Sequence, residues 1–145
     1  MTPTLPKQFA AVHNGLYRVP TAAHTWRDAV LAQNLYWATL DLAGISTKKG
    51  FLDACAHTLQ FPAGLGGNWD ALADCLEDLS WLPSVGLVMH WRNGKAFASA
   101  CEADVALALE ILESAAGFWK RNQRTFVVLL DEGCCAGRVL PALAP

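Results

Sequence analysis

Four acidic residues gather between Asp70 and Asp78, and their spacing is the feature of the sequence that could do chemistry. Winding this stretch as an α-helix at about 100° per residue places Asp74 about 40° and Glu77 about −20° from Asp70, with Asp78 near 80°. The opposite side of the same helix carries Leu72, Leu76 and Leu79. The sequence therefore predicts an exposed acidic face and a buried apolar face.

An enzyme could use Asp70 and Asp74 as an acid/base or metal pair, with His57 or His90 as a third group. Such a pair needs a concave, dry site that separates the two pKa values, whereas an exposed helix face is convex and solvated. The histidines lack metal-ligand spacing, and motifs of hydrolases, zinc proteases, P-loops and dinucleotide-binding folds are absent. The sequence therefore favours a protein that is not an enzyme, with no catalytic residues, metal or cofactor.

The acidic face has no cationic neighbour in the sequence, since no Lys or Arg occurs between Phe61 and Met89. Asp70 and Asp74 are four residues apart, so their repulsion should cost a few tenths of a kcal/mol. The pattern is compatible with the solvated face of an ordinary amphipathic helix. It is equally compatible with an anionic surface that meets a cationic partner.

A glycine-rich loop with Gly64, Gly66 and Gly67 precedes this helix. Asn68 follows the loop as a good N-cap, and Pro83 is expected to stop the helical pattern. The loop lacks the Lys and Ser/Thr of a P-loop, and the nearby carboxylates would repel phosphate. We therefore expect the glycines to serve a tight turn.

A family resemblance is carried by the run FPAGLGGNWDALADCL, continued by DLSWLP and by HWR at residues 90–92. These motifs resemble the barstar family of intracellular ribonuclease inhibitors, and the resemblance extends over about Leu35 to Asp131. It implies a barnase-like ribonuclease as partner, whose cationic active site is blocked by Asp70 and Asp74 as phosphate mimics. The partner-binding residues predicted in this way are Gly64, Leu65, Gly67, Asn68, Asp70, Ala73, Asp74, Glu77 and Asp78.

The chain departs from the family at three of the bulky contact positions, which here hold Gly64, Ala73 and Leu79. A smaller contact area should weaken or redirect binding. The alternative function is therefore an orphan barstar-like interaction module with a partner that is not a ribonuclease.

Three apolar runs, separated by helical patterns, predict the central strands at residues 35–40, 85–91 and 126–130. Helices are expected at 47–59, 95–101 and 104–119, in addition to the acidic helix. This order predicts an α/β domain over residues 35–131, with a small, about three-stranded parallel sheet and packed helices. The resemblance implies the same fold.

Residues 1–34 are predicted to form an N-terminal extension, with a short strand at 16–19 and a helix at 22–33 that Thr21 caps. Residues 132–145 are expected to be a flexible C-terminal tail. Trp69 is expected to pack, and Trp81 could either pack or bind.

The 145 residues are 53% hydrophobic and 17% charged, which predicts a compact folded domain and excludes a disordered chain. No apolar run reaches the length of a membrane span, and no stripe of basic residues indicates binding to nucleic acid. The N-terminal residues also lack the pattern of a signal peptide. We expect a cytoplasmic monomer whose thiols are all free. The five cysteines are Cys55, Cys75, Cys101, Cys134 and Cys135; the adjacent last two lack zinc-site spacing.

Overall fold

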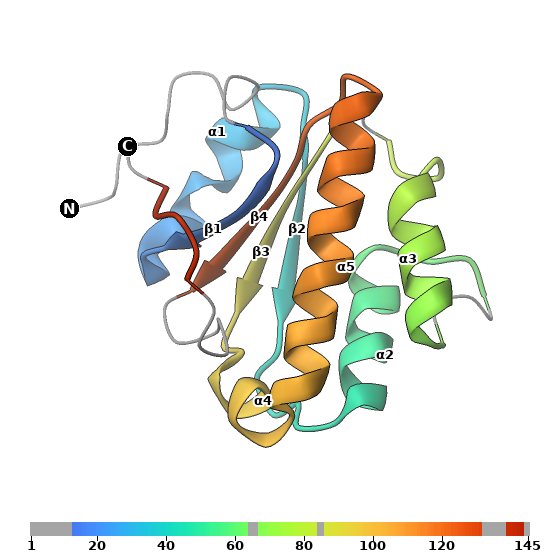
Figure 1. The fold of residues 1–145 in the computed structure, drawn as a ribbon. Coiled ribbons are helices and arrows are strands. Elements are labelled where there is room, and N and C mark those ends of the chain that lie inside the picture. Colours follow the sequence, from blue (N-terminus) through green and yellow to red (C-terminus); the bar gives the residue numbers. More distant parts are fainter. Residues whose placement is uncertain (1–12, 64–66, 84–85, 132–138, 144–145) are drawn as a thin grey trace.

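The structure is a computed structural model that describes residues 13–63, 67–83, 86–131 and 139–143. These residues form an α/β fold around one parallel sheet with the strand order β1-β4-β3-β2 (Figure 1). The strands are β1 (Gly15–Val19), β2 (Tyr36–Asp41), β3 (Leu87–Arg92) and β4 (Phe126–Asp131). The predicted fold class is confirmed, and a fourth strand arises because the N-terminal extension supplies β1.

Four α-helices pack on one side of the sheet, where α5 runs along the strands with α3 beside it and α4 lies near the ends of the strands (Figure 1). They are α2 (Lys48–Thr58), α3 (Trp69–Asp78), α4 (Lys95–Ala100) and α5 (Glu102–Arg121). The larger core fills this layer, and Phe51, Trp91 and Phe97 are among its fully buried members. α5 carries Glu102 and Asp104 in its first turn and basic residues in its last, in agreement with the helix dipole.

The opposite face of the sheet is covered by the N-terminal extension, through the 3-10 helix η2 (Thr21–Trp26) and the helix α1 (Arg27–Leu31). A second buried cluster forms here, with Trp26 and Val30 packed against Trp37, Val88 and Leu129. The predicted single helix over 22–33 is wrong. Pro20, rather than Thr21, stands before the first turn, and the early residues include weak helix formers, so the segment begins as a tighter 3-10 turn.

Part of the expected C-terminal tail is docked on β1. The amide of Arg18 donates to the carbonyl of Pro141 at 2.9 Å, and the amide of Leu143 donates to the carbonyl of Arg18 at 3.0 Å. Leu140 is buried in the larger core. Residues 139–143 are therefore not a free tail, and the rest of the tail lies outside the described residues.

One side chain joins the start of β1 to the start of β4. The amide group of Asn14 donates to the carbonyls of Ala116 and Arg124, at 3.2 and 2.7 Å, and its oxygen accepts from the amide of Phe126 at 2.9 Å. Asn14 thus satisfies backbone groups of α5, of the connection after it and of the first residue of β4.

The helices of the described residues include none that is long and apolar enough to cross a membrane. Cys55, Cys75 and Cys101 have free thiols, whereas Cys134 and Cys135 lie outside the described residues. Burial raises the pKa of Cys55. Burial, with smaller contributions from Asp74 and Asp78, also raises the pKa of Cys75, so both thiols are held in their unreactive form.

Candidate functional site

The acidic helix α3 starts where the sequence predicts. Asn68 has an extended backbone, and its Oδ1 accepts a hydrogen bond from the amide of Ala71 at 2.8 Å. This bond satisfies one of the free amides of the first turn, to which Asp70 adds a favourable negative charge. Gly67 is exposed with open space around it, whereas Gly64 and Leu65 lie outside the described residues.

The far end of α3 differs from the prediction, because the helix stops at Asp78 and not at Pro83. Leu79 takes the left-handed conformation, with φ 47° and ψ 24°, and its amide donates to the carbonyl of Cys75 at 3.1 Å. A leucine is rarely found there. This conformation turns the Leu79 side chain into the core, where it is 2% exposed. Its burial stabilises the turn, although Leu79 lies beyond the helix.

Two tryptophans fix α3 and its exit. Trp119 of α5 donates its indole N–H to the carbonyl of Leu76 at 2.8 Å, and Trp81 donates to the carbonyl of Leu59 at 2.8 Å. The first bond satisfies a carbonyl in the last turn of α3, which the helix itself leaves open. Trp81 is half-buried against Phe61, so both indoles contribute to packing.

The helical wheel is confirmed for most of α3. Leu72 and Leu76 are each 1% exposed, whereas Asp70, Asp74 and Asp78 are exposed. Trp69 is half-buried and packs on Phe51, as predicted. α3 therefore presents its aspartates on a surface held from beneath by the core.

Glu77 is the exception, since it was predicted to be exposed and is half-buried. The wheel considers only the side of α3 that faces the core, whereas α5 runs alongside the helix and covers part of the acidic face (Figure 1). Ala73 is half-buried for the same reason.

Cations from distant segments lie near both ends of α3. Arg124, just after α5, lines a depression of about 280 Å³ together with Glu77, Asp78 and Trp119. The ammonium of Lys48 lies 5.6 Å from the centre of the Trp69 ring. Within the described residues, neither cation comes within ion-pair distance of an α3 carboxylate. Neither Lys48 nor Arg124 belongs to the sequence around α3, so the pattern of that stretch could not predict that these cations lie near the helix.

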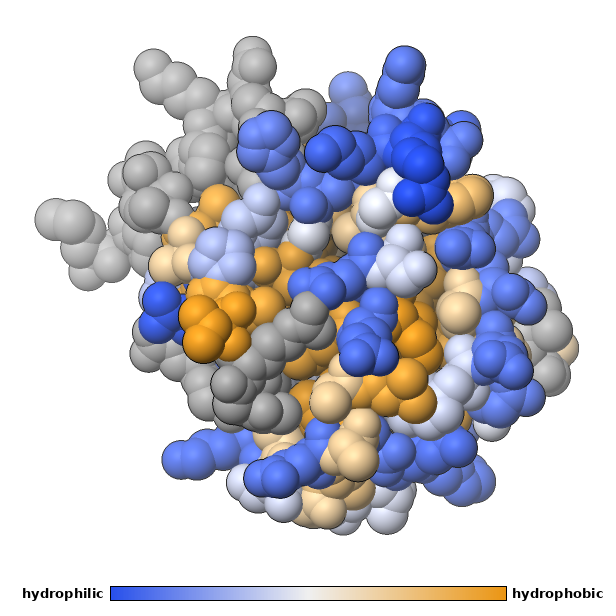
Figure 2. All heavy atoms as spheres, in the orientation of Figure 1, coloured by the Kyte–Doolittle hydropathy of each residue, from blue (hydrophilic) through white to orange (hydrophobic). Residues whose placement is uncertain are grey.

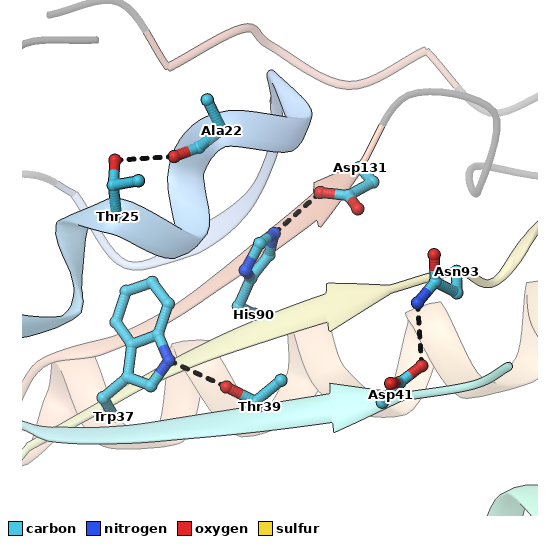
Figure 3. A network of polar contacts seen from close by, with 8 residues as sticks. All are labelled: Ala22, Thr25, Trp37, Thr39, Asp41, His90, Asn93 and Asp131. Carbon is cyan, nitrogen blue, oxygen red and sulfur yellow. Dashed lines mark hydrogen bonds and ion pairs between the residues drawn. The ribbon is translucent and has the colours of Figure 1, made fainter. Parts of the chain in front are cut away.

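The alternative acid/base site combined Asp70 and Asp74 with His57 or His90; His57 is exposed on α2, and His90 is not brought together with the two aspartates. His90 lies on the η2 face of the sheet, where its Nε2 is 2.7 Å from Asp131 Oδ1 and its ring packs edge-on against Trp37 (Figure 3). Asp70 and Asp74 are on α3, on the opposite face of the sheet. The described residues contain no group of three or more side chains that could hold a metal ion.

The matching family is described as Barstar (barnase inhibitor), and its profile matches residues 35–131 of the chain. The chain belongs to the barstar family. The matched segment includes α3 and every helix on its side of the sheet, whereas β1, η2, α1 and residues 139–143 lie outside it. Proteins of the barstar family are inhibitors rather than enzymes, and the family implies a barnase-like ribonuclease as partner. A comparison with curated proteins finds no match.

Proposed function

We propose that this protein inhibits a barnase-type ribonuclease by placing α3 in the cationic active site of that enzyme. Asp70 and Asp74 take the positions of substrate phosphates, and Asn68, Asp78, Glu77 and Ala73 border the contact. Gly64, Leu65 and Gly67 extend it onto the preceding loop. The observation that carries the proposal is that Asp70 and Asp74 are exposed on an anchored helix and have no ion pair within the described residues.

The chemistry of the partner explains this arrangement. An enzyme that cleaves RNA must hold an anionic phosphodiester, and it does so with cationic side chains. Carboxylates that already stand free can form charge-assisted hydrogen bonds to those cations without first breaking bonds of their own. Trp119 and the buried leucines hold α3 in place before the partner binds. The helix therefore loses little conformational entropy on association.

The direct test is inhibition of barnase, the ribonuclease in the family's description, by the purified protein. The wild-type protein should inhibit RNA cleavage. Asp74→Ala should accelerate dissociation and cost about 2–5 kcal/mol of binding energy, the range for hydrogen-bonded charge pairs at interfaces. Asp28→Ala removes the same charge from α1, behind the sheet, and should leave the affinity unchanged.

Salt gives a second measurement on the same complex. Association should slow as salt rises from about 0.05 to 0.5 M, because the attraction between an acidic helix and a cationic cleft is screened within about 10 Å at 0.1 M. A wild-type protein that leaves barnase fully active would contradict inhibition of this enzyme. Recovery of a partner other than a nuclease from native cytosol would then favour the orphan interaction module.

A further inference from the structure

A groove runs along the contact between α3 and α5, next to the depression that contains Arg124. It has a volume of about 160 Å³. Its walls come from Ala73 and Glu77 on α3 and from Leu107, Glu110, Ile111 and Ser114 on α5. In Figure 2 this side of the molecule shows hydrophobic surface over α5, bordered by hydrophilic side chains toward α3. The groove therefore adjoins the aspartate face without being part of it.

The floor of the groove is apolar and accessible. Leu107 is 36% exposed, and only two other large hydrophobic side chains of the described residues, Leu31 and Val139, are as exposed. Ile111 follows one helical turn later and is half-buried. Ala73 and Ser114 are small and line the groove from the two helices, so it is left unfilled. An occupant could therefore bury apolar atoms between the helices.

The rim of the groove is acidic. Glu110 is exposed, whereas Glu77 is half-buried and, within the described residues, has no side-chain hydrogen bond or ion pair. A carboxylate that is partly removed from water without a partner carries a cost that a cation would relieve. Arg124 lines the neighbouring depression without reaching ion-pair distance.

We propose that the α3–α5 groove receives one lysine or arginine side chain of the partner. The methylene stem lies on Leu107 and Ile111, and the charged end meets Glu77 and Glu110, since long cationic side chains cover apolar surface while their charge stays at a polar rim. This inference rests on the proposed function, because the occupant belongs to the cationic nuclease that α3 binds. It makes α5 a determinant of which nuclease is recognised.

Filling the groove tests the proposal in the barnase complex. Ser114→Leu adds a large side chain at the groove wall, and we expect dissociation to become at least about tenfold faster. Ala106→Leu makes a similar addition at an exposed position of α5 outside the groove and should stay within about twofold of wild type. A Ser114→Leu protein that binds as wild type, while Asp74→Ala binds weakly, overturns the groove and leaves the proposed function standing.

Charge at the rim is tested with a matched pair. Glu110→Gln should speed dissociation about 1.5- to 5-fold, the effect of losing one exposed ion pair. Glu102→Gln removes the same charge from the exposed start of α5 and should change only the association rate. Equal dissociation rates for the two variants would contradict a cation at Glu110.

The groove can also be tested without a nuclease, so that the two proposals fail separately. N-acetyl-arginine amide, titrated into ¹⁵N-labelled protein, should shift the amide signals of Glu77, Glu110 and Ser114, and Ser114→Leu should abolish these shifts. Equal shifts with neutral N-acetyl-leucine amide, or shifts confined to Asp70 and Asp74, overturn the proposal whatever barnase does.

Discussion

On the α3 side of the sheet, Asp70 and Asp74 are exposed and without an ion pair in the described residues, whereas on the η2 side Asp131 is buried with its Oδ1 2.7 Å from His90 Nε2. The two sets of carboxylates have different consequences for the protein. A buried carboxylate without its partner would be strongly destabilising, so Asp131 is tied to the folded state. The exposed aspartates contribute almost nothing to folding, and therefore stay free to bind. The two faces thus separate stability from recognition.

The largest expected effect breaks the buried pair. Asp131→Ala leaves both ring nitrogens of His90 buried without a hydrogen-bond partner among the described residues and should lower the free energy of unfolding by roughly 2–3 kcal/mol, the upper part of the range for a buried polar group left unpaired. Urea unfolding measures this change. The control Asp74→Ala, which removes an exposed carboxylate beyond the first turn of α3, should leave the free energy of unfolding within a few tenths of a kcal/mol of wild type. If both variants lost similar stability, the contrast between the faces would be wrong.

The next effect concerns the anchor beneath the acidic helix. Trp119→Phe keeps most of the buried ring but leaves the carbonyl of Leu76 without its indole donor, and should cost roughly 1–3 kcal/mol in unfolding free energy. The same variant should weaken nuclease binding, because α3 is held less firmly. Thermal unfolding and the dissociation rate are measured on one preparation. Unchanged stability would show that the indole bond does not anchor α3.

A smaller effect is expected at the start of α3. Asn68→Ala removes the bond to the amide of Ala71 and should cost about 1 kcal/mol of stability. Asn68→Asp can still accept that bond, so it should retain most of the stability and serves as the control. Circular dichroism during urea unfolding provides the comparison. A loss of equal size in both variants would assign Asn68 a role other than capping.

The smallest effect concerns Asp41, which is exposed like the aspartates of α3 but has a hydrogen-bond partner like Asp131. The amide group of Asn93 donates to Asp41 at 2.9 Å, and this bond, followed by that from the amide of Ala43, lowers the pKa of Asp41 (Figure 3). Since the folded pKa lies below the unfolded value of about 4, the stabilisation is present above that pH and is lost as pH falls through the folded pKa. Asn93→Ala should raise the pKa of Asp41 in an NMR titration. An unchanged value would contradict this cause.

The sequence was sufficient for the features that arise within one element. The wheel of α3 apart from Glu77, the cap at Asn68 and the positions of the three central strands along the chain all depend on residues close in the chain, and the structure confirms them. What the sequence missed depends on packing between distant elements. Glu77 is half-buried because α5 lies beside it, and Leu107 and Arg124 come from α5 and from the residues just after it, which β3 and α4 separate from α3 in the sequence.

For the N-terminal extension, too, the sequence predicts the local structure but not the partner against which it packs. Leu16 to Val19 alternates as a strand should, but nothing in those residues says that their partner is β4. The docking of residues 139–143 was equally hidden, because it depends on backbone hydrogen bonds to Arg18 and on the burial of Leu140 in a core formed by distant elements. The single helix expected over 22–33 is instead a 3-10 helix followed by a short α-helix, and the buried contacts of Trp26 and Val30 with the sheet could not be deduced from those residues alone.

The pairing of β1 with β4 also determines when this protein can fold during its synthesis. Asn14 and Phe126 are joined by a hydrogen bond although they are 112 residues apart, and residues 139–143 then cover β1. Gly15–Val19 leave the ribosome before β2, β3 and all the helices, whereas their partner strand β4 follows only after these elements. Contacts so distant in sequence are slow to form, because the intervening chain must first be closed into a loop. The N-terminal strand must therefore remain without its sheet partner until β4 has been synthesised, whatever part of the chain between them folds first.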